Sequence, residues 1–147
     1  MRKWQKIISE AFSAILIFLF VYTALSKLIN FHSFVIVLSK YPLIHSYSYL
    51  IAIVLPLVEL LISALLSVQK HREKGFVIST FLMFFFTLYI AYMLAFTPEL
   101  PCSCGGVLQS LGWKEHLIFN CFFMLLSIIG WLTESKNKIE DLKILLQ

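Results

Sequence analysis

The apolar positions along the chain form four runs, each long enough to cross a lipid bilayer. They cover residues 8–29, 49–68, 76–96 and 116–132. A segment of about 20 mostly apolar residues is needed to cross roughly 30 Å of hydrocarbon, and a single segment satisfies its backbone there only as a helix. The pattern therefore predicts an all-α membrane protein: a bundle of four transmembrane helices, formed as one domain over residues 1–147.

Two shorter patterns lie outside these runs and predict short interfacial helices. Phe31, Phe34 and Leu38 recur at helical spacing before Pro42, which is typical of an amphipathic helix in the membrane interface. After the fourth run, apolar residues line one face of the charged segment 134–147. We expect that segment to be a cytoplasmic amphipathic tail.

Composition and charge support a membrane location and predict an orientation. Hydrophobic residues make up 60% of the chain, against about half in soluble domains. Nine of the 12 Lys and Arg residues precede the first run, separate the second from the third, or follow the fourth. Because short loops rich in Lys and Arg stay in the cytoplasm, we expect both termini there. The net charge of +4 then reflects topology and gives no reason to expect nucleic-acid binding.

The loop before the fourth run, which this topology places outside the cytoplasm, contains the sequence Pro-Cys-Ser-Cys-Gly-Gly. Cys102 and Cys104 can form a disulfide only if the chain turns, because an extended tripeptide spans roughly 7 Å and the bridge needs Cα atoms about 5.5 Å apart. Gly105 and Gly106 make such a turn accessible. So small a ring would be strained, and strained disulfides are the reducible ones. The alternatives are two unrelated thiols or half of a metal site.

Three charged residues fall inside the apolar runs. Glu10 is close to the inner end of the first run and is expected to extend to the interface. Glu59 lies near the middle of the second run, where an ionised carboxylate costs several kcal/mol unless it is paired or hydrated. It is either a proton-exchanging group or a carboxyl group hydrogen-bonded between helices. Lys27 lies near the outer end of the first run. It either extends to the interface or lowers the pKa of a nearby cysteine thiol, which increases the nucleophilic thiolate fraction.

Other candidate residues lie in the third and fourth runs. The aromatic residues 84–86 and Tyr89 resemble a cofactor-binding cluster, but aromatic residues at this density more often face lipid or pack against other helices, and this is what we expect. His116 and Asn120 stand one turn apart directly after the cysteine loop, and His116 is an interfacial residue, a base for the thiol or a metal ligand. Cys121 is either a third thiol in the exchange or a small apolar residue.

In combination, these features resemble the DoxX-like group of four-helix membrane proteins, and more closely its methylamine-utilisation branch, MauE. The resemblance rests on residues 22–28 (Tyr-Thr-Ala-Leu-Ser-Lys-Leu), Phe31 and Phe34, residues 56–60 (Pro-Leu-Val-Glu-Leu) and residues 102–105 (Cys-Ser-Cys-Gly). Ala24 and Ser63 depart from it, since glycine is expected at both positions.

The resemblance implies a multi-pass protein of the bacterial inner membrane that supports disulfide chemistry outside the cytoplasm beside a thioredoxin-like partner. It places Lys27, Glu59, Cys102 and Cys104 on the patterned positions of the family.

The leading hypothesis is a membrane redox protein that acts as a thiol-disulfide oxidoreductase. Cys102 and Cys104 exchange disulfides with the thioredoxin-like partner, Lys27 or His116 tunes the thiolate, and Glu59 handles protons. The electrons pass to a membrane quinone or a second partner protein, and no covalently bound cofactor is expected.

Two alternatives remain open. In one, the protein is a metal-binding or assembly module that anchors a membrane maturation complex. Cys102 and Cys104 would then hold a soft ion such as Cu(I) together with His116, or with His32 or His45 from the other outward loop. In the other, it oxidises or reduces small sulfur compounds, which only the wider DoxX-like resemblance implies.

Overall fold

The computed structural model describes residues 2–40, 44–96 and 113–145, and every regular element within these ranges is a helix. The elements are α1 (Arg2–Ile29), α2 (Phe31–Ser39), the short 3₁₀ helix η1 (His45–Tyr47), α3 (Ser48–Ser67), α4 (Arg72–Phe96) and α5 (Trp113–Leu145). The predicted all-α fold is confirmed, and the helix expected after the first run is present as α2.

Within the described ranges, four helical segments are long and apolar enough to cross a membrane. They are Trp4–Ile29, His45–Ser67, Arg72–Phe96 and Lys114–Glu140. The protein is therefore a multi-pass membrane protein. All four of the long helices begin before the apolar runs do. In α1, α4 and α5 the reason is that charged residues such as Arg72 and Lys114 extend the helix into the polar zone.

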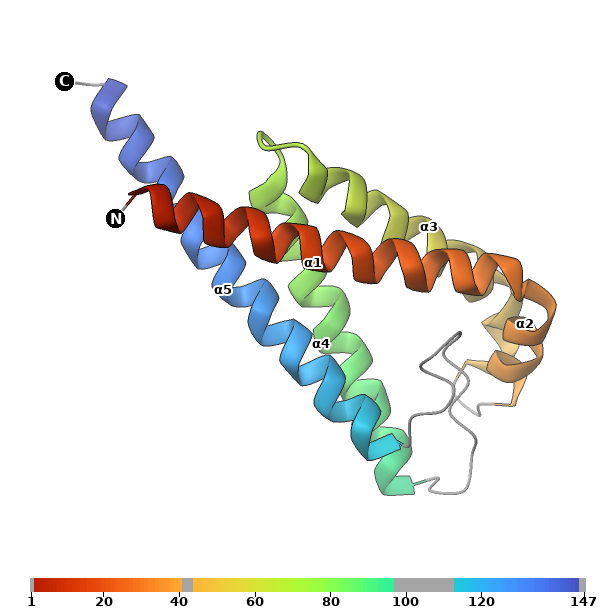
Figure 1. Cartoon of the computed structure of the whole chain (residues 1–147). Coiled ribbons are helices and arrows are strands. Elements are labelled where there is room, and N and C mark those ends of the chain that lie inside the picture. The colour runs from red at the N-terminus through yellow and green to blue at the C-terminus, as the bar shows by residue number, and fades with distance from the viewer. Residues whose placement is uncertain (1, 41–43, 97–112, 146–147) are drawn as a thin grey trace.

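The fourth helix differs from expectation at its C-terminal end. We expected a separate tail over residues 134–147, but α5 continues without interruption to Leu145. The residues after Gly130 include several good helix formers and no proline, so nothing breaks the helix there. At 33 residues α5 is about 50 Å long, against roughly 30 Å of hydrocarbon, and it extends past the other helices in Figure 1.

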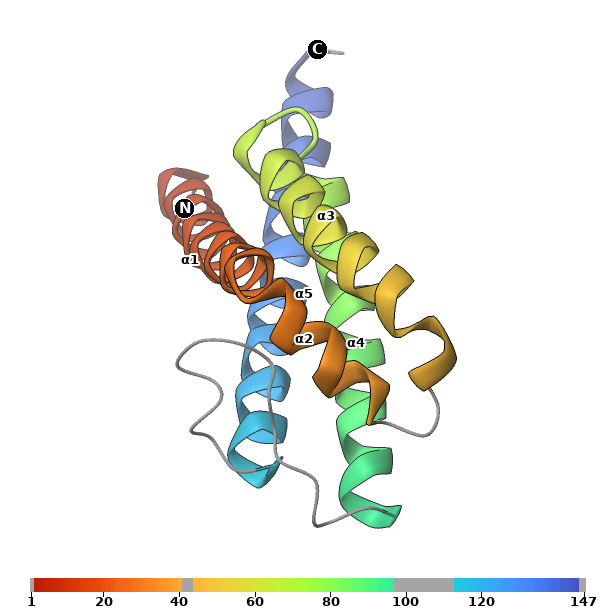
Figure 2. The same ribbon diagram turned by 90° about the vertical axis from the view of Figure 1, so that its right-hand side faces the viewer.

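The long helices form two pairs, α1 with α3 and α4 with α5. Figure 1 shows both chain termini at one end of the bundle and the two pairs diverging toward the other end, where α2 lies. Figure 2 looks toward α2, which runs obliquely from the end of α1 in the direction of α3. The bundle is therefore compact near the termini and splayed at the opposite end.

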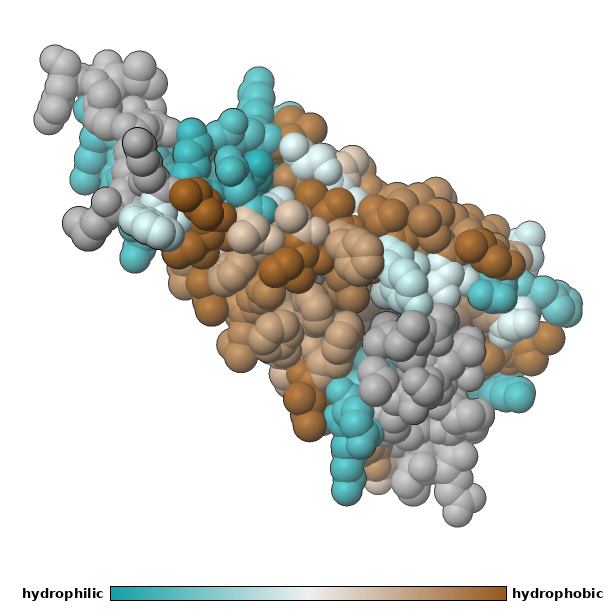
Figure 3. Space-filling view, in the orientation of Figure 1, coloured by the Kyte–Doolittle hydropathy of each residue, from teal (hydrophilic) through white to brown (hydrophobic). Residues whose placement is uncertain are grey.

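The main hydrophobic core lies between the pairs. Its fully buried members include Leu16 and Phe20 of α1, Ile62 of α3 and Phe76 of α4. The outer surface is also apolar: hydrophobic residues cover much of the face seen in Figure 3, and hydrophilic ones gather toward its ends. Exposed side chains such as Phe18 are what a protein solvated by lipid presents.

Buried polar side chains connect the helices at the compact end. Ser9 of α1 donates a hydrogen bond to Glu134 of α5. Ser13 of α1 donates to the backbone oxygen of Leu66 in α3 at 2.9 Å. Small hydroxyl-bearing residues let membrane helices approach closely and satisfy one another's polar groups.

The α4–α5 contact depends on one glycine. Ser127 of α5 donates a hydrogen bond to the backbone oxygen of Phe76 at 2.9 Å, and one turn further Gly130 faces the Phe76 ring so closely that an added Cβ would overlap it. Any larger residue at position 130 must therefore push the two helices apart or displace a fully buried ring.

We expect Gly130→Ala to destabilise the protein. Overpacking of a core costs typically 1–3 kcal/mol, whereas replacing a helical glycine by alanine gains at most about 1 kcal/mol. The cost of the overlap with Phe76 therefore exceeds the gain in helix propensity. The measurement is the unfolding midpoint of the purified protein in detergent. In a Phe76→Leu background the same substitution should cost less, since the smaller side chain leaves room. Equal or higher stability of Gly130→Ala would contradict the close α4–α5 contact.

Candidate functional site

The most unusual feature of the interior is an ion pair between α1 and α3. The Nζ atom of Lys27 lies 2.8 Å from Oε1 and 3.1 Å from Oε2 of Glu59. Lys27 is 5% exposed and Glu59 is 3% exposed. Lys27 therefore does not extend to the interface, and the two intramembrane charges neutralise each other.

The surrounding groups complete the coordination of the ammonium group. Lys27 Nζ also donates to the backbone oxygen of Thr23, one turn earlier on α1, at 3.3 Å. It lies 6.0 Å from the centroid of the Phe34 ring of α2, at the outer limit of a cation–π interaction. With two carboxylate oxygens and one carbonyl as acceptors, all three ammonium protons have a partner.

The sequence of α3 explains why Glu59 faces inward. Ala52, Pro56, Glu59 and Ser63 are all buried, and their spacing of four, three and four residues places them on one face of a helix. Pro56 has no N–H to donate to the backbone oxygen one turn earlier. The hydroxyl of Ser63 donates to the backbone oxygen of Glu59 at 3.0 Å. This face is the polar stripe of an otherwise lipid-exposed helix.

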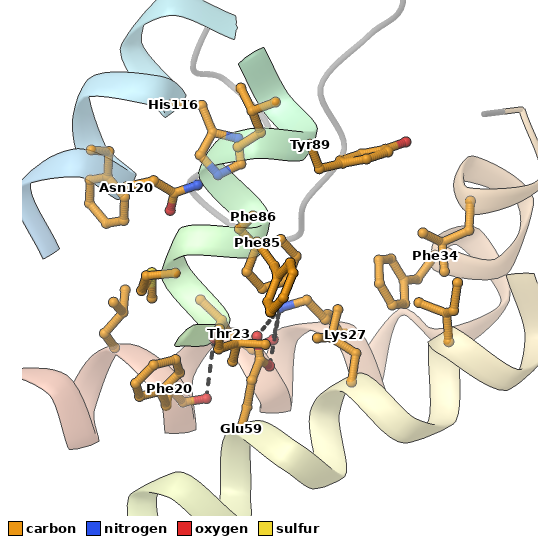
Figure 4. Close-up of a pocket in the computed structure, with 18 of the residues that line it drawn as sticks. Phe20, Thr23, Lys27, Phe34, Glu59, Phe85, Phe86, Tyr89, His116 and Asn120 are labelled. Carbon is orange, nitrogen blue, oxygen red and sulfur yellow. Dashed lines mark hydrogen bonds and ion pairs between the residues drawn. The ribbon is translucent and has the colours of Figure 1, made fainter. Parts of the chain in front are cut away.

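The ion pair lines a cavity of about 290 Å³ at the splayed end of the bundle. All five α-helices contribute to the wall, with Thr23 from α1, Phe34 from α2, Leu55 from α3, Phe86 from α4 and Asn120 from α5. Figure 4 shows these side chains surrounding the space between the two helix pairs.

A second polar group lies across the cavity. His116 and Asn120 of α5 are each 5% exposed and both line it. In Figure 4 they lie at one end, with the rings of Phe85 and Phe86 between them and the ion pair. His116 is thus buried within the bundle, three residues after α5 begins at Trp113.

The aromatic run of α4 has a mixed role. Phe85, Phe86 and Tyr89 line the cavity, although the sequence predicted lipid contact or packing for them. Phe85 is also 64% exposed, and Phe84 is 46% exposed, so part of the run does face outward. Consecutive residues point about 100° apart on a helix, so a run of three cannot share one environment.

Cys102 and Cys104 lie outside the described residues. The loop that carries them leaves α4 seven residues after Tyr89 and enters α5 three residues before His116. It is therefore attached at the end of the bundle that holds the cavity. The third cysteine, Cys121, is half-buried on α5 with a free thiol.

Of the candidate metal ligands suggested by the sequence, His32, His45 and His116 are described, and the two cysteines are not. Among the residues that the structure does describe, no three His, Cys, Asp or Glu side chains gather where they could hold a metal ion.

The contact between Lys27 and Glu59 was missed by the sequence analysis, which treated each residue alone. One signal was present. Charged residues inside membrane helices usually pair with one another, and opposite charges stood in two consecutive apolar runs. The residues are 32 positions apart, so local periodicity could not show that they meet.

Comparison with known proteins gives one match. The family model described as methylamine utilisation protein MauE matches residues 5–133, which include the ion pair, the two loop cysteines and His116. No curated protein and no solved structure matches the chain. Since the family model covers most of the sequence, the chain belongs to the MauE family.

Proposed function

We propose that this MauE-family protein is a membrane redox protein that exchanges disulfides through Cys102 and Cys104 with a thioredoxin-like protein outside the cytoplasm. Membership of the family is consistent with a membrane maturation or redox-associated role. The observation that carries the proposal is the buried ion pair of Lys27 and Glu59 in a cavity at the end of the bundle to which the cysteine loop is attached. Charged groups at such depth are costly, and they usually mark function.

The exchange balances in atoms and electrons. A thiolate of the partner attacks the Cys102–Cys104 disulfide, a mixed disulfide forms, and the second partner thiol displaces it. The partner leaves oxidised, and Cys102 and Cys104 become two thiols. Their return to the disulfide releases two electrons and two protons, which a membrane quinone or a second partner protein must accept.

The ion pair supplies a means of moving those protons inside the bundle. When a proton passes from the Lys27 ammonium to the Glu59 carboxylate, two charged groups become two neutral ones and the net charge stays zero. Release of a proton from the pair leaves one buried negative charge, so each proton given up must be replaced by one released from the loop thiols, and the pair acts as a relay. Glu59 is the acceptor in this step, and the hydrogen bonds of 2.8 and 3.1 Å already provide the path.

Orientation is part of the proposal. The bias of nine to three in the placement of Lys and Arg residues favours cytoplasmic termini. Both termini lie at the same end of the bundle (Figure 1), as four crossings require. The cavity and the cysteine loop then lie toward the outer face of a bacterial inner membrane, where disulfides persist.

Thiol trapping in intact cells tests the exchange. We expect a membrane-impermeant maleimide to label the wild-type loop only after prior reduction, and Cys102→Ser or Cys104→Ser to accumulate a mixed disulfide with the partner. Cys121→Ser is the matched control and should behave as wild type. Full labelling without reduction, with no trapped adduct, would contradict the proposal. Metal bound stoichiometrically to the purified protein and lost in Cys104→Ser would then favour the metal-binding alternative.

Substitutions in the ion pair separate its structural role from its proposed role in proton transfer during disulfide exchange. Lys27→Met or Glu59→Gln alone should lower stability by about 3–5 kcal/mol, because each leaves the other charge buried without a partner. The double variant Lys27→Met/Glu59→Leu removes both charges and should recover most of the unfolding midpoint. We expect it still to fail in turning over the partner's thiols. A double variant with normal turnover would show that the pair is structural only.

A further inference from the structure

We infer that the cavity binds the head ring of a membrane quinone, with one ring oxygen at the ion pair of Lys27 and Glu59 and the other at His116 and Asn120. The inference rests on the proposed function for its source of electrons. It names the acceptor that the cysteine pair requires and the side chains that would hold it.

The size of the cavity fits a ring without its tail. A volume of about 290 Å³ is at the lower end of the roughly 300–1,000 Å³ typical of small-molecule sites. An apolar cavity of about 150 Å³ already accepts benzene. The walls are largely aromatic and aliphatic, with Phe20, Phe86 and Tyr89 among them, and such walls favour a flat, apolar ring.

The polar groups fit a ligand with two acceptors on opposite sides. A para-quinone has two carbonyl oxygens across its ring, both acceptors only. At one end of the cavity Lys27 donates to a ring oxygen when that oxygen replaces the backbone oxygen of Thr23, its most distant acceptor at 3.3 Å. At the other end Asn120 offers a side-chain amide, beside His116 (Figure 4). A ring placed between them would contact the rings of Phe85 and Phe86, which lie between the two polar ends.

Charge balance argues against an anionic ligand. Both Glu59 oxygens are within 3.1 Å of the Lys27 ammonium group, so the pair presents no unbalanced positive charge. An anion such as a sulfite or a carboxylate would enter a mostly apolar cavity without compensation. A neutral molecule with hydrogen-bond acceptors loses less solvation free energy on entering the cavity.

The entry for a quinone is assigned to α4, beside Phe85. This residue both lines the cavity and is 64% exposed. A quinone with an isoprenoid tail could enter there and leave its tail among the acyl chains.

The overall step is balanced by two electrons and two protons. When the thiols of Cys102 and Cys104 form a disulfide, they release two electrons and two protons. The quinone takes up both electrons and both protons and becomes a hydroquinone. The proton held by the ion pair is placed to reach one ring oxygen. His116 lines the cavity at the other.

Equilibrium binding to the full-length protein in lipid nanodiscs tests the site, with a decyl-tailed benzoquinone as the probe. We expect one saturable site per chain. Asn120→Leu removes the amide at nearly constant volume, and Leu55→Phe fills the cavity from α3. Each should weaken binding at least tenfold. Ser127→Ala, on α5 at the compact end, is the matched control and should bind as wild type. Only variants whose unfolding midpoint equals that of the wild type are compared.

Photolabelling with an azido derivative of the same quinone gives a second, independent readout. Adducts should map to peptides from α4 and α5 that contain residues 85–90 and 116–120, and excess unlabelled quinone should suppress them. Unsaturable partitioning into the nanodisc, equal binding by Leu55→Phe, or adducts spread evenly over the helices would overturn the inference.

A cysteine variant distinguishes the failure of this inference from the failure of the proposed function. Cys102→Ser/Cys104→Ser should bind the quinone like wild type but should not reduce it in the presence of reduced partner. If thiol trapping succeeds and quinone binding fails, the cavity is no quinone site and the exchange proposal stands with a protein acceptor. If the quinone binds but the thiols never form a disulfide, the exchange proposal fails and the binding site stands.

Discussion

The pairing of Lys27 with Glu59 constrains the rest of the structure. A charge buried alone within the hydrocarbon is far costlier than a pair that satisfies itself, and here all three ammonium protons have acceptors. The pair therefore fixes how α1 and α3 face each other. A rotation of α3 by one residue, about 100°, would turn Glu59 away from Lys27 and toward lipid. The inward stripe of Ala52, Pro56 and Ser63 would turn with it.

The two ends of the bundle differ in how closely the helices pack. Near the termini, small residues such as Ser13, Ser127 and Gly130 allow close contact and hydrogen bonding between helices. At the other end, bulky side chains hold the helix pairs apart, and the space between them is the cavity. Packing at the compact end can compensate for the poor packing and buried charges around the site.

The features that depend on local pattern were predictable from the sequence. The four membrane helices follow from apolar runs, and α2 follows from the spacing of Phe31, Phe34 and Leu38, of which the last two are buried. The uninterrupted length of α5 was missed because the change from apolar to charged residues was taken as a boundary, although a helix needs no such boundary. Composition changed at that point, but helix propensity did not.

The site was predictable only in part, because its geometry depends on contacts between distant residues. Lys27, Glu59 and His116 were singled out by their chemistry, yet nothing local indicated that two of them touch or that the third is buried. The run 84–86 is aromatic at every position, so it has no periodicity. The residues that line the cavity could therefore not be distinguished from those that face lipid. Cys102 and Cys104 lie outside the described residues, and their role stays a prediction.

The splayed shape makes the two leaflets of the membrane inequivalent for this protein. The cavity is lined by α2 and by residues in the half of the bundle away from the termini, and its proposed boundary with the surrounding lipid is at Phe85. A lipophilic molecule whose polar head rests at one depth in the bilayer meets that boundary most readily from the leaflet at the splayed end. Its availability is then set by its mole fraction in that leaflet and by how fast it crosses from the other, and not by its concentration in either aqueous compartment.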